Sequence, residues 1–169
     1  MNAGVPEYET AVLAGGCFWG MEEILRKVPG VVGTVVGYTG GSVDFPKYED
    51  VKSGKTGHAE AILITFDPAK LSYGSLLDLF FTMHDPTTPG RQGNDTGSQY
   101  RSAVFFTSPA QEKEAAAAME RARSSGLWKK PLVTELTPFG KFWPAEEYHQ
   151  AYLRKHPGGY TCHYIRTKD

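Results

Sequence analysis

The segment Gly15–Gly20 places a thiol among residues that suit a reactive site. Cys17 lies between glycines and two large aromatic residues, Phe18 and Trp19. The glycines permit a tight turn and leave room for a ligand. The residues that follow have apolar side chains at three- and four-residue spacing, which predicts a helix with Cys17 in its first turn, where the helix dipole favours a thiolate. We therefore expect a reactive cysteine beside an apolar pocket wall made by Phe18 and Trp19.

A second candidate is Glu60, which follows Gly57-His58-Ala59 and begins an apolar run. A glutamate at the end of a strand is most often solvated. A partly buried carboxyl group instead has a raised pKa and can donate a proton at neutral pH. The residues alone leave both interpretations of Glu60 open.

Three further polar residues lie near the ends of two long polar loops. The loops span residues 40–58 and 85–99, and the side chains are those of Tyr48, Asp95 and Tyr100. Long ordered loops in a compact domain are often functional. Most tyrosines, however, pack in the core with a satisfied hydroxyl group. The contribution of these three residues therefore depends on the chemistry at Cys17.

The second cysteine, Cys162, lies in the glycine-bearing segment Gly158–His163 near the C-terminus. Two cysteines are too few for a disulfide scaffold, and their spacing does not suit a zinc site. Cys162 is either an incidental exposed thiol or a resolving cysteine that a mobile tail carries to an oxidised Cys17. Because it is the only other cysteine, the redox interpretation is favoured.

Composition and local motifs exclude several classes of protein. A net charge of −1 gives no sign of nucleic-acid binding or of an anionic membrane surface. No stretch approaches the length of a membrane span, and Met1–Thr10 lacks a signal pattern, so we expect a cytoplasmic location.

The histidines are scattered without ligand spacing, so no metal site is predicted. Ser53–Gly57 looks like a phosphate loop, but Glu49 stands where that motif needs a glycine, which argues against nucleotide binding.

The apolar periodicity predicts a mixture of strands and helices. Strands are expected over 8–13, 31–38, 60–66, 102–107 and 132–136, and helices from Cys17 to about 30, over 71–84, over 109–124 and over 146–155. Ser108 is expected to cap the third helix, with Pro109 as its first residue and Gln111 completing a capping box. This order predicts an α+β fold, a two-layer sandwich with a mixed central sheet and long irregular loops. We expect one domain, 1–169, with a core over 8–155 and a tail over 156–169.

The chain resembles the peptide methionine sulfoxide reductase A family, enzymes specific for the S epimer of methionine sulfoxide. Many segments match the family in order over about Ala11–Tyr164. The first matches are residues 16–20 and 37–41, followed by the set Tyr48, Val51, Gly54 and 56–60. The later matches are residues 84–87, 92–95, 97–102, 145–146 and 148–150. Enzymes of this kind reverse the oxidation of methionine. The fold that the resemblance implies is a two-layer α+β sandwich with irregular wrapping segments.

The resemblance also implies roles for the candidate residues. Cys17 matches the nucleophile, and Glu60 matches the acid that protonates the sulfoxide oxygen. Phe18 and Trp19 match the aromatics that hold the S-methyl group. Tyr48 and Tyr100 match the tyrosines whose hydroxyl groups bind the sulfoxide oxygen. Asp95 matches a polar residue of the pocket. In this reaction methionine leaves and Cys17 becomes a sulfenic acid.

The family cycle needs a second thiol and an external reductant rather than a bound cofactor. Cys162 is expected to condense with the sulfenic acid, and a dithiol such as thioredoxin would reduce the resulting disulfide. Many members place the resolving cysteine directly after a Gly-Tyr pair, whereas here Thr161 intervenes. The expected substrates are oxidised proteins or peptides and free methionine sulfoxide, acted on by a monomer.

Two alternative functions use the same thiol. A thiol peroxidase would form the same sulfenic acid but would prefer a small polar pocket over the Phe18–Trp19 wall. A redox sensor or a methionine-sulfoxide binding module would be modified or would bind without turnover. A thioredoxin-coupled assay with each separate sulfoxide epimer distinguishes these functions.

Overall fold

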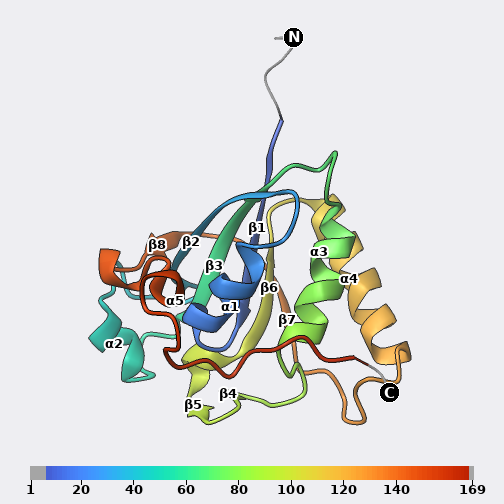
Figure 1. Cartoon of the computed structure of the whole chain (residues 1–169). Coiled ribbons are helices and arrows are strands. Elements are labelled where there is room, and N and C mark those ends of the chain that lie inside the picture. The colour runs from blue at the N-terminus through green and yellow to red at the C-terminus, as the bar shows by residue number, and fades with distance from the viewer. Residues whose placement is uncertain (1–6, 168–169) are drawn as a thin grey trace.

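A twisted six-stranded sheet forms the centre of the computed structural model, which describes residues 7–167 (Figure 1). The strands lie in the order β7-β6-β1-β3-β2-β8. Their bounds are β1 Glu9–Gly15, β2 Val31–Thr39, β3 Ala59–Phe66, β6 Ser102–Phe106, β7 Glu135–Pro138 and β8 Phe142–Pro144. β6 and β7 pair in parallel, and the other neighbours in this sheet pair antiparallel. The predicted mixed sheet of an α+β fold is therefore confirmed.

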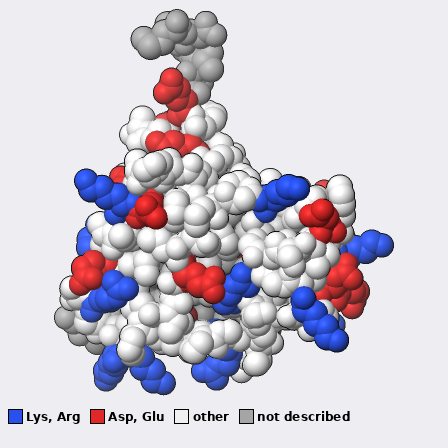
Figure 2. All heavy atoms as spheres, turned by 180° about the vertical axis from the view of Figure 1, so that it is seen from behind, with Lys and Arg blue, Asp and Glu red and all other residues white. Residues whose placement is uncertain are grey.

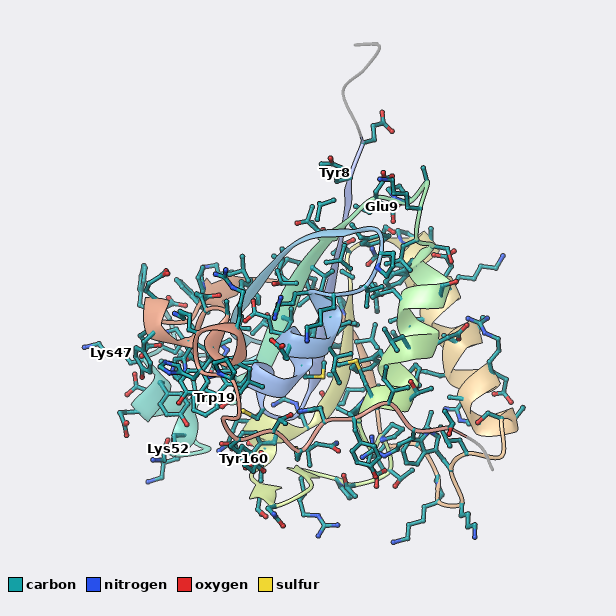
Figure 3. The ribbon with its side chains drawn as sticks, in the orientation of Figure 1. Tyr8, Glu9, Trp19, Lys47, Lys52 and Tyr160 are labelled. Carbon is teal, nitrogen blue, oxygen red and sulfur yellow. The ribbon has the colours of Figure 1, made fainter. Side chains whose placement is uncertain are left out.

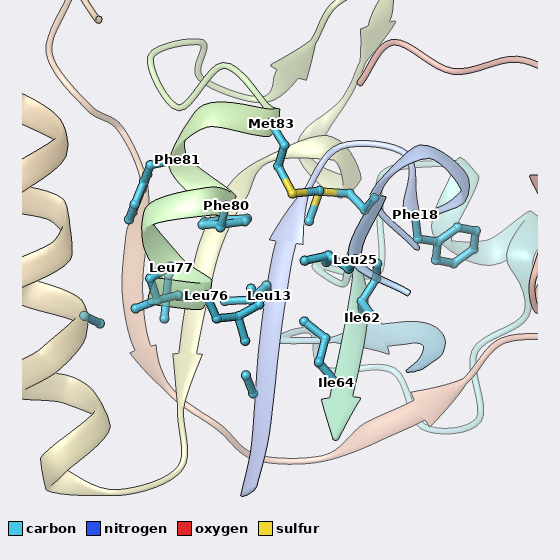
Figure 4. Close-up of a cluster of buried hydrophobic side chains, with 14 of the residues drawn as sticks. Leu13, Phe18, Leu25, Ile62, Ile64, Leu76, Leu77, Phe80, Phe81 and Met83 are labelled. Atoms are coloured by element: carbon cyan, nitrogen blue, oxygen red, sulfur yellow. The ribbon is translucent and has the colours of Figure 1, made fainter. Parts of the chain in front are cut away.

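Helices cover one face of this sheet. The longer ones are α1 Phe18–Leu25, α3 Tyr73–Met83 and α4 Pro109–Ser124. Their apolar side chains meet alternate residues of the central strands, among them Leu13, Ile62 and Ile64, in the larger core (Figure 4). Because side chains alternate along a strand, Glu60 lies on this helix-covered face together with Ile62 and Ile64.

The opposite face carries small residues of β1, β3 and β6 and is covered by Phe139 and Phe142, which flank the turn between β7 and β8. Acidic and basic side chains are interspersed over the side of the molecule seen from behind (Figure 2). No helix among residues 7–167 has both the length and the apolar content to cross a membrane.

Short elements lie in the segments that were expected to be loops. The region 40–58 contains the helix α2 Tyr48–Lys52, and 85–99 contains the hairpin β4 Arg91–Gln92 with β5 Asp95–Thr96. The 3₁₀ helix η1 Ser98–Tyr100 follows. These elements have two to five residues, so they are too short to produce a clear periodic pattern.

Helix α4 begins and ends where the sequence places it. Ser108 is the cap, and its hydroxyl accepts a hydrogen bond from the backbone N–H of Gln111. The second half of the capping box differs from the expectation, because the Gln111 side chain accepts from Thr107 N rather than from the cap. The Gln111 amide also donates to Thr10 O, which ties the start of α4 to β1.

The predicted boundaries of three other elements were wrong. Helix α1 ends at Leu25 rather than near residue 30, because the chain turns through Val28 and Pro29 into β2. The strand expected at 132–136 lies at Glu135–Pro138. The helix expected at 146–155 is broken into η2 Glu147–His149 and α5 Tyr152–Lys155.

Ala151 causes the break between η2 and α5. Its backbone is left-handed, with φ of +50°, a conformation that interrupts a right-handed helix. The buried Glu22 of α1 accepts a hydrogen bond of 2.7 Å from Ala151 N, which holds the chain in this shape. Tertiary contacts therefore override the helical pattern of the segment.

Gln150 fastens this broken segment to the sheet, and its removal is expected to destabilise the fold. The side chain accepts from Val36 N and donates to Val36 O and Ala145 O, each at 2.9–3.0 Å. Gln150→Ala should lower the free energy of unfolding by about 2 kcal/mol, because it leaves Val36 N and Ala145 O without these partners, whereas Val36 O keeps its hydrogen bond from Ala145 N. Urea unfolding measures this change. A loss below about 0.5 kcal/mol would contradict it.

Candidate active site

Cys17 is the N-terminal cap residue of α1, as the sequence predicts, and it is 9% exposed. The turn before it depends on Gly16, whose φ is +101°. A Cβ atom at Gly16 would lie 2.6 Å from the Gln92 side chain, so only glycine fits there. Gly16 therefore lets the loop 85–99 pack directly against the segment that carries the thiol.

Glu60 is buried, which decides between the two interpretations of its position at the start of an apolar strand. Its side chain is 2% exposed, and its Oε1 atom accepts a hydrogen bond of 3.2 Å from Phe18 N. That N–H belongs to the first turn of α1, where backbone donors have no partner within the helix. Burial raises the pKa of Glu60 to about 8, so the carboxyl group holds a proton at neutral pH.

The same environment overturns one expectation about Cys17. Burial raises the pKa of the Cys17 thiol well above its ordinary value, and the nearby Glu60 raises it further. The Trp19 N–H lowers this pKa, but by less than burial raises it. The expected preference for a thiolate at the helix start was therefore wrong for the free protein, in which Cys17 is a neutral thiol.

Two tyrosines supply neutral hydroxyl groups around Glu60. The pKa of Tyr48 is raised to about 12, by burial first and then by Glu60. The pKa of Tyr100 is also raised, by burial first and then by Glu60, with smaller effects of Tyr48, Asp95 and Cys17. Glu60 therefore acts electrostatically on both hydroxyl groups. Both tyrosines keep their protons and can donate hydrogen bonds at neutral pH.

Glu146 positions Tyr48 relative to the sheet. One of its carboxyl oxygens accepts from the Tyr38 hydroxyl at 2.9 Å and the other from Tyr48 N at 3.0 Å. Tyr38 of β2 is the register partner of Glu60 in β3. Glu146 therefore connects the start of α2 to the strand pair that carries Glu60.

Phe18 and Trp19 form an aromatic group with His149. Phe18 is 1% exposed, and its ring centroid lies 5.2 Å from that of His149. Trp19 Nε1 donates to His149 Nδ1 at 2.9 Å, and its indole stacks on Tyr152 at 3.8 Å. Figure 3 shows Trp19 at the end of the sheet where α1 begins. The two aromatics adjoin Cys17 in the chain and have fixed orientations, which suits a wall for an apolar group.

Sequence reasoning treated His149 as a structural residue, and it missed the role of Glu146. His149 is 1% exposed and packs on Tyr48 with ring centroids 4.6 Å apart, so it belongs to the site. The one local signal was the neighbouring Tyr148, whose ring packs on His149; the contacts with Phe18, Trp19 and Tyr48 come from distant parts of the sequence.

The C-terminal segment is docked against the site, which contradicts the expectation of a mobile tail. His163 Nε2 bonds to Gly15 O at 2.7 Å, and Arg166 N donates to Thr82 O at 2.9 Å. Residues 168–169 of the expected tail lie outside the described residues. Because Gly15 directly precedes the Gly16–Cys17 turn, the tail runs beside the reactive segment.

Asp95 contacts the tail through Tyr160 and Cys162. It accepts a hydrogen bond of 3.2 Å from the Tyr160 hydroxyl, and its Oδ2 atom is 4.0 Å from Cys162 Sγ. Cys162 is half-buried, and both cysteines are free thiols. Cys162 also adds a small further rise to the pKa of Cys17.

Comparison with known proteins identifies the family. The family model described as peptide methionine sulfoxide reductase matches residues 9–169. A peptide methionine sulfoxide reductase of Mycobacterium sp. (strain MCS) is 52% identical over 160 residues, which cover 95% of this chain and 91% of that protein. The chain belongs to the peptide methionine sulfoxide reductase family.

Solved structures of this reductase family share the fold. Mxr1 from Saccharomyces cerevisiae in its reduced form aligns with a TM-score of 0.90 and 38% identity, over 95% of this chain and 93% of Mxr1. Mxr1 in complex with Trx2 aligns with a TM-score of 0.66 and 29% identity, over 98% of this chain and 97% of that chain. The predicted fold, family and enzymatic reduction of methionine sulfoxide are confirmed.

The raised pKa of Glu60 should make the stability of this reductase depend on pH. Between 4.5, the ordinary pKa of a glutamate, and about 8, the folded protein holds a proton that the unfolded chain has lost. This group therefore lowers the stability of the wild type by about 1.4 kcal/mol for each pH unit as pH rises through the window.

Glu60→Gln removes the titrating group but keeps its shape, so the stability of this variant relative to the wild type should grow as pH rises. Urea unfolding at stepped pH measures this difference. A difference that stays the same at every pH would show that Glu60 has an ordinary pKa.

Proposed function

We propose that this reductase acts on the S epimer of methionine sulfoxide, in oxidised proteins and peptides and as the free amino acid, with Cys17 as the nucleophile and Glu60 as the acid. The observation that carries the proposal is the buried carboxyl of Glu60. It is neutral at neutral pH and is hydrogen-bonded to the residue after Cys17. An acid in this position can give a proton to an oxygen while the thiol attacks the sulfur bonded to it.

The first step transfers the sulfoxide oxygen to Cys17. The Cys17 sulfur attacks the substrate sulfur while Glu60, Tyr48 and Tyr100 bind the oxygen. Glu60 protonates this oxygen and takes up the proton of the thiol, the oxygen ends on Cys17 as a sulfenic acid, and methionine leaves. The substrate sulfur gains two electrons and Cys17 loses two, so the step balances without a bound cofactor.

A neutral Cys17 is compatible with this step. A thiolate at Cys17 would be unstable before substrate arrives, because the thiol is buried and no cation among residues 7–167 lowers its pKa appreciably. The polarised sulfoxide brings a partial positive charge on sulfur, which stabilises the sulfur of Cys17 as it loses its proton. Reactivity then appears only with substrate bound.

The layout of the pocket supports selection of one epimer. Phe18 and Trp19 offer an apolar surface beside Cys17, whereas Tyr48, Tyr100 and Glu60 offer hydrogen-bond donors. Exchanging oxygen and methyl on the sulfoxide would place oxygen against the aromatics and leave the buried donors unpaired. A mismatch of this kind rejects a substrate strongly.

The second half of the cycle is proposed to use Cys162 and thioredoxin. Cys162 condenses with the sulfenic acid to form a disulfide and water, and a dithiol protein reduces the disulfide by exchange. The solved complex of Mxr1 with Trx2 supports a thioredoxin as this reductant. We further propose a cytoplasmic monomer, a single domain over 1–169 whose tail over 156–169 carries Cys162, and no prosthetic group.

The proposed first step predicts a strict loss of activity in Cys17→Ser. The variant should release no methionine from the S epimer, and the wild type should release methionine from the S epimer but not from the R epimer. Rapid quenching without reductant, followed by chromatography of methionine, measures both. Turnover by Cys17→Ser, or equal use of the two epimers, would remove the proposal.

The acid role of Glu60 predicts a slower first step in Glu60→Gln. The loss should be about 10²- to 10⁴-fold, because the amide can bind the oxygen but cannot give it a proton. The same single-turnover experiment measures the rate, and circular dichroism controls for the fold. An unchanged rate would contradict the role.

The resolving role of Cys162 predicts a split between the two halves of the cycle. Cys162→Ser should release one methionine per enzyme molecule at the wild-type rate and then stop, because thioredoxin finds no disulfide to reduce. Turnover is followed with thioredoxin and its reductase. Continued thioredoxin-driven turnover would show that Cys162 is a bystander.

A further inference from the structure

His163 stands next to the proposed resolving thiol and has a fixed tautomer. Its ring is 7% exposed, and Nε2 lies 2.7 Å from Gly15 O. A carbonyl oxygen can only accept a hydrogen bond, so Nε2 carries the proton. Burial lowers the pKa of His163 to about 4, so the ring is neutral at neutral pH and Nδ1 has a free lone pair.

Nδ1 of His163 is directed at Cys162. The distance from Nδ1 to Cys162 Sγ is 3.9 Å, which is within the range of a hydrogen bond to sulfur. The backbone N–H of His163 also donates to Thr161 Oγ1 at 3.1 Å, which fixes the turn of the Thr161-Cys162-His163 segment. A base with an open lone pair therefore faces the thiol that must lose its proton.

The imidazole also packs against the segment that carries Cys17. A Cβ atom at Gly20 would lie 2.3 Å from His163 Nδ1, and one at Gly16 would lie 3.2 Å from its Nε2. Gly16 and Gly20, one on each side of Cys17, thus leave room for this ring. The ring of His163 therefore joins the segment of Cys162 to the segment of Cys17.

Two other acceptors lie near Cys162 Sγ, and both are less available to take its proton. Gln92 O, at 3.8 Å, is a carbonyl oxygen and cannot hold a proton at neutral pH. Asp95 Oδ2, at 4.0 Å, already accepts from the Tyr160 hydroxyl. Asp95 is also part of the β4–β5 hairpin, whereas His163 adjoins Cys162 in the chain.

We propose that His163 is the general base of the resolving step, in which its Nδ1 atom takes the thiol proton of Cys162 as the Cys162 sulfur attacks the sulfenic acid of Cys17. This inference rests on the proposed function, because it needs the sulfenic acid and the resolving role of Cys162. The S–S bond forms and the S–O bond of the sulfenic acid breaks. The oxygen leaves as hydroxide and becomes water with the proton held by His163, so no other reactant is needed.

The surroundings of His163 favour return of this proton. Arg166 of the tail and His84 at the end of α3 are the titratable groups that face it, apart from Cys162 itself. The positive charge of Arg166 disfavours a lasting imidazolium ion. His84 is also neutral, since burial lowers its pKa to about 3. His163 therefore returns the proton to the leaving hydroxide.

The variant His163→Gln tests this inference, because methionine release and disulfide formation can be measured separately in it. Glutamine can place an amide N–H where His163 Nε2 donates to Gly15 O, so the tail keeps its anchor, but it has no basic atom at the place of Nδ1. The matched control is His156→Gln, the same substitution at an exposed histidine of α5's C-terminal cap. Rapid quenching with S-epimer substrate follows methionine release and the loss of both thiols over a range of pH.

Disulfide formation in His163→Gln should be about 10²-fold slower than in the wild type at neutral pH. Its rate should rise about tenfold for each pH unit, because the thiol must then ionise without a base. The wild type and His156→Gln should show little dependence above neutral pH. This slope is the decisive readout, since loss of a purely structural contact lowers the rate equally at every pH.

Two results would overturn the inference: an unchanged rate of disulfide formation in His163→Gln, or a loss that is the same at every pH. Both are distinguishable from failure of the proposed function. If the wild type releases no methionine, or if Cys162→Ser still forms an internal disulfide, the proposed cycle itself fails.

Discussion

The hydrogen bond from Phe18 N to the buried carboxyl of Glu60 is the contact on which the site depends. It joins the first turn of α1 to β3, so the thiol, the acid and the aromatic wall have one fixed arrangement. The bond satisfies one carboxyl oxygen, and burial keeps the group protonated. A charged carboxylate in this place would be costly, because desolvation outweighs the single backbone donor.

The rest of the fold can be understood as support for this contact. The pairing of β2 with β3 puts Tyr38 opposite Glu60, and Glu146 then ties Tyr38 to the start of α2 and so to Tyr48. The tail reaches the same place from the other end of the chain through the bond of His163 to Gly15. A site made of segments so distant in sequence needs the whole sheet to hold its geometry.

Much of this arrangement could be predicted from local patterns. The strand with Ile62 and Ile64, the capped helix after Ser108 and the Cys17 turn all have strong periodic or capping signals. The broken helix at Ala151 and the neutral state of Cys17 could not be predicted in this way. Ala151 is held by Glu22, and the pKa of Cys17 is raised first by burial and then by Glu60, so both depend on residues far away in the sequence. Burial is a property of the folded chain, so the balance between helix dipole and desolvation cannot be judged from neighbours alone.

The most direct test of the account is the pKa of Glu60 in the free enzyme. The enzyme is labelled with an NMR-active carbon isotope at its glutamate carboxyl groups and titrated by NMR. The signal that is missing from the spectrum of Glu60→Gln is assigned to Glu60. The account predicts a midpoint near 8, with Glu60 protonated at neutral pH. A midpoint near 4.5, the ordinary value, would contradict it, because the site would then hold a carboxylate with no proton to give.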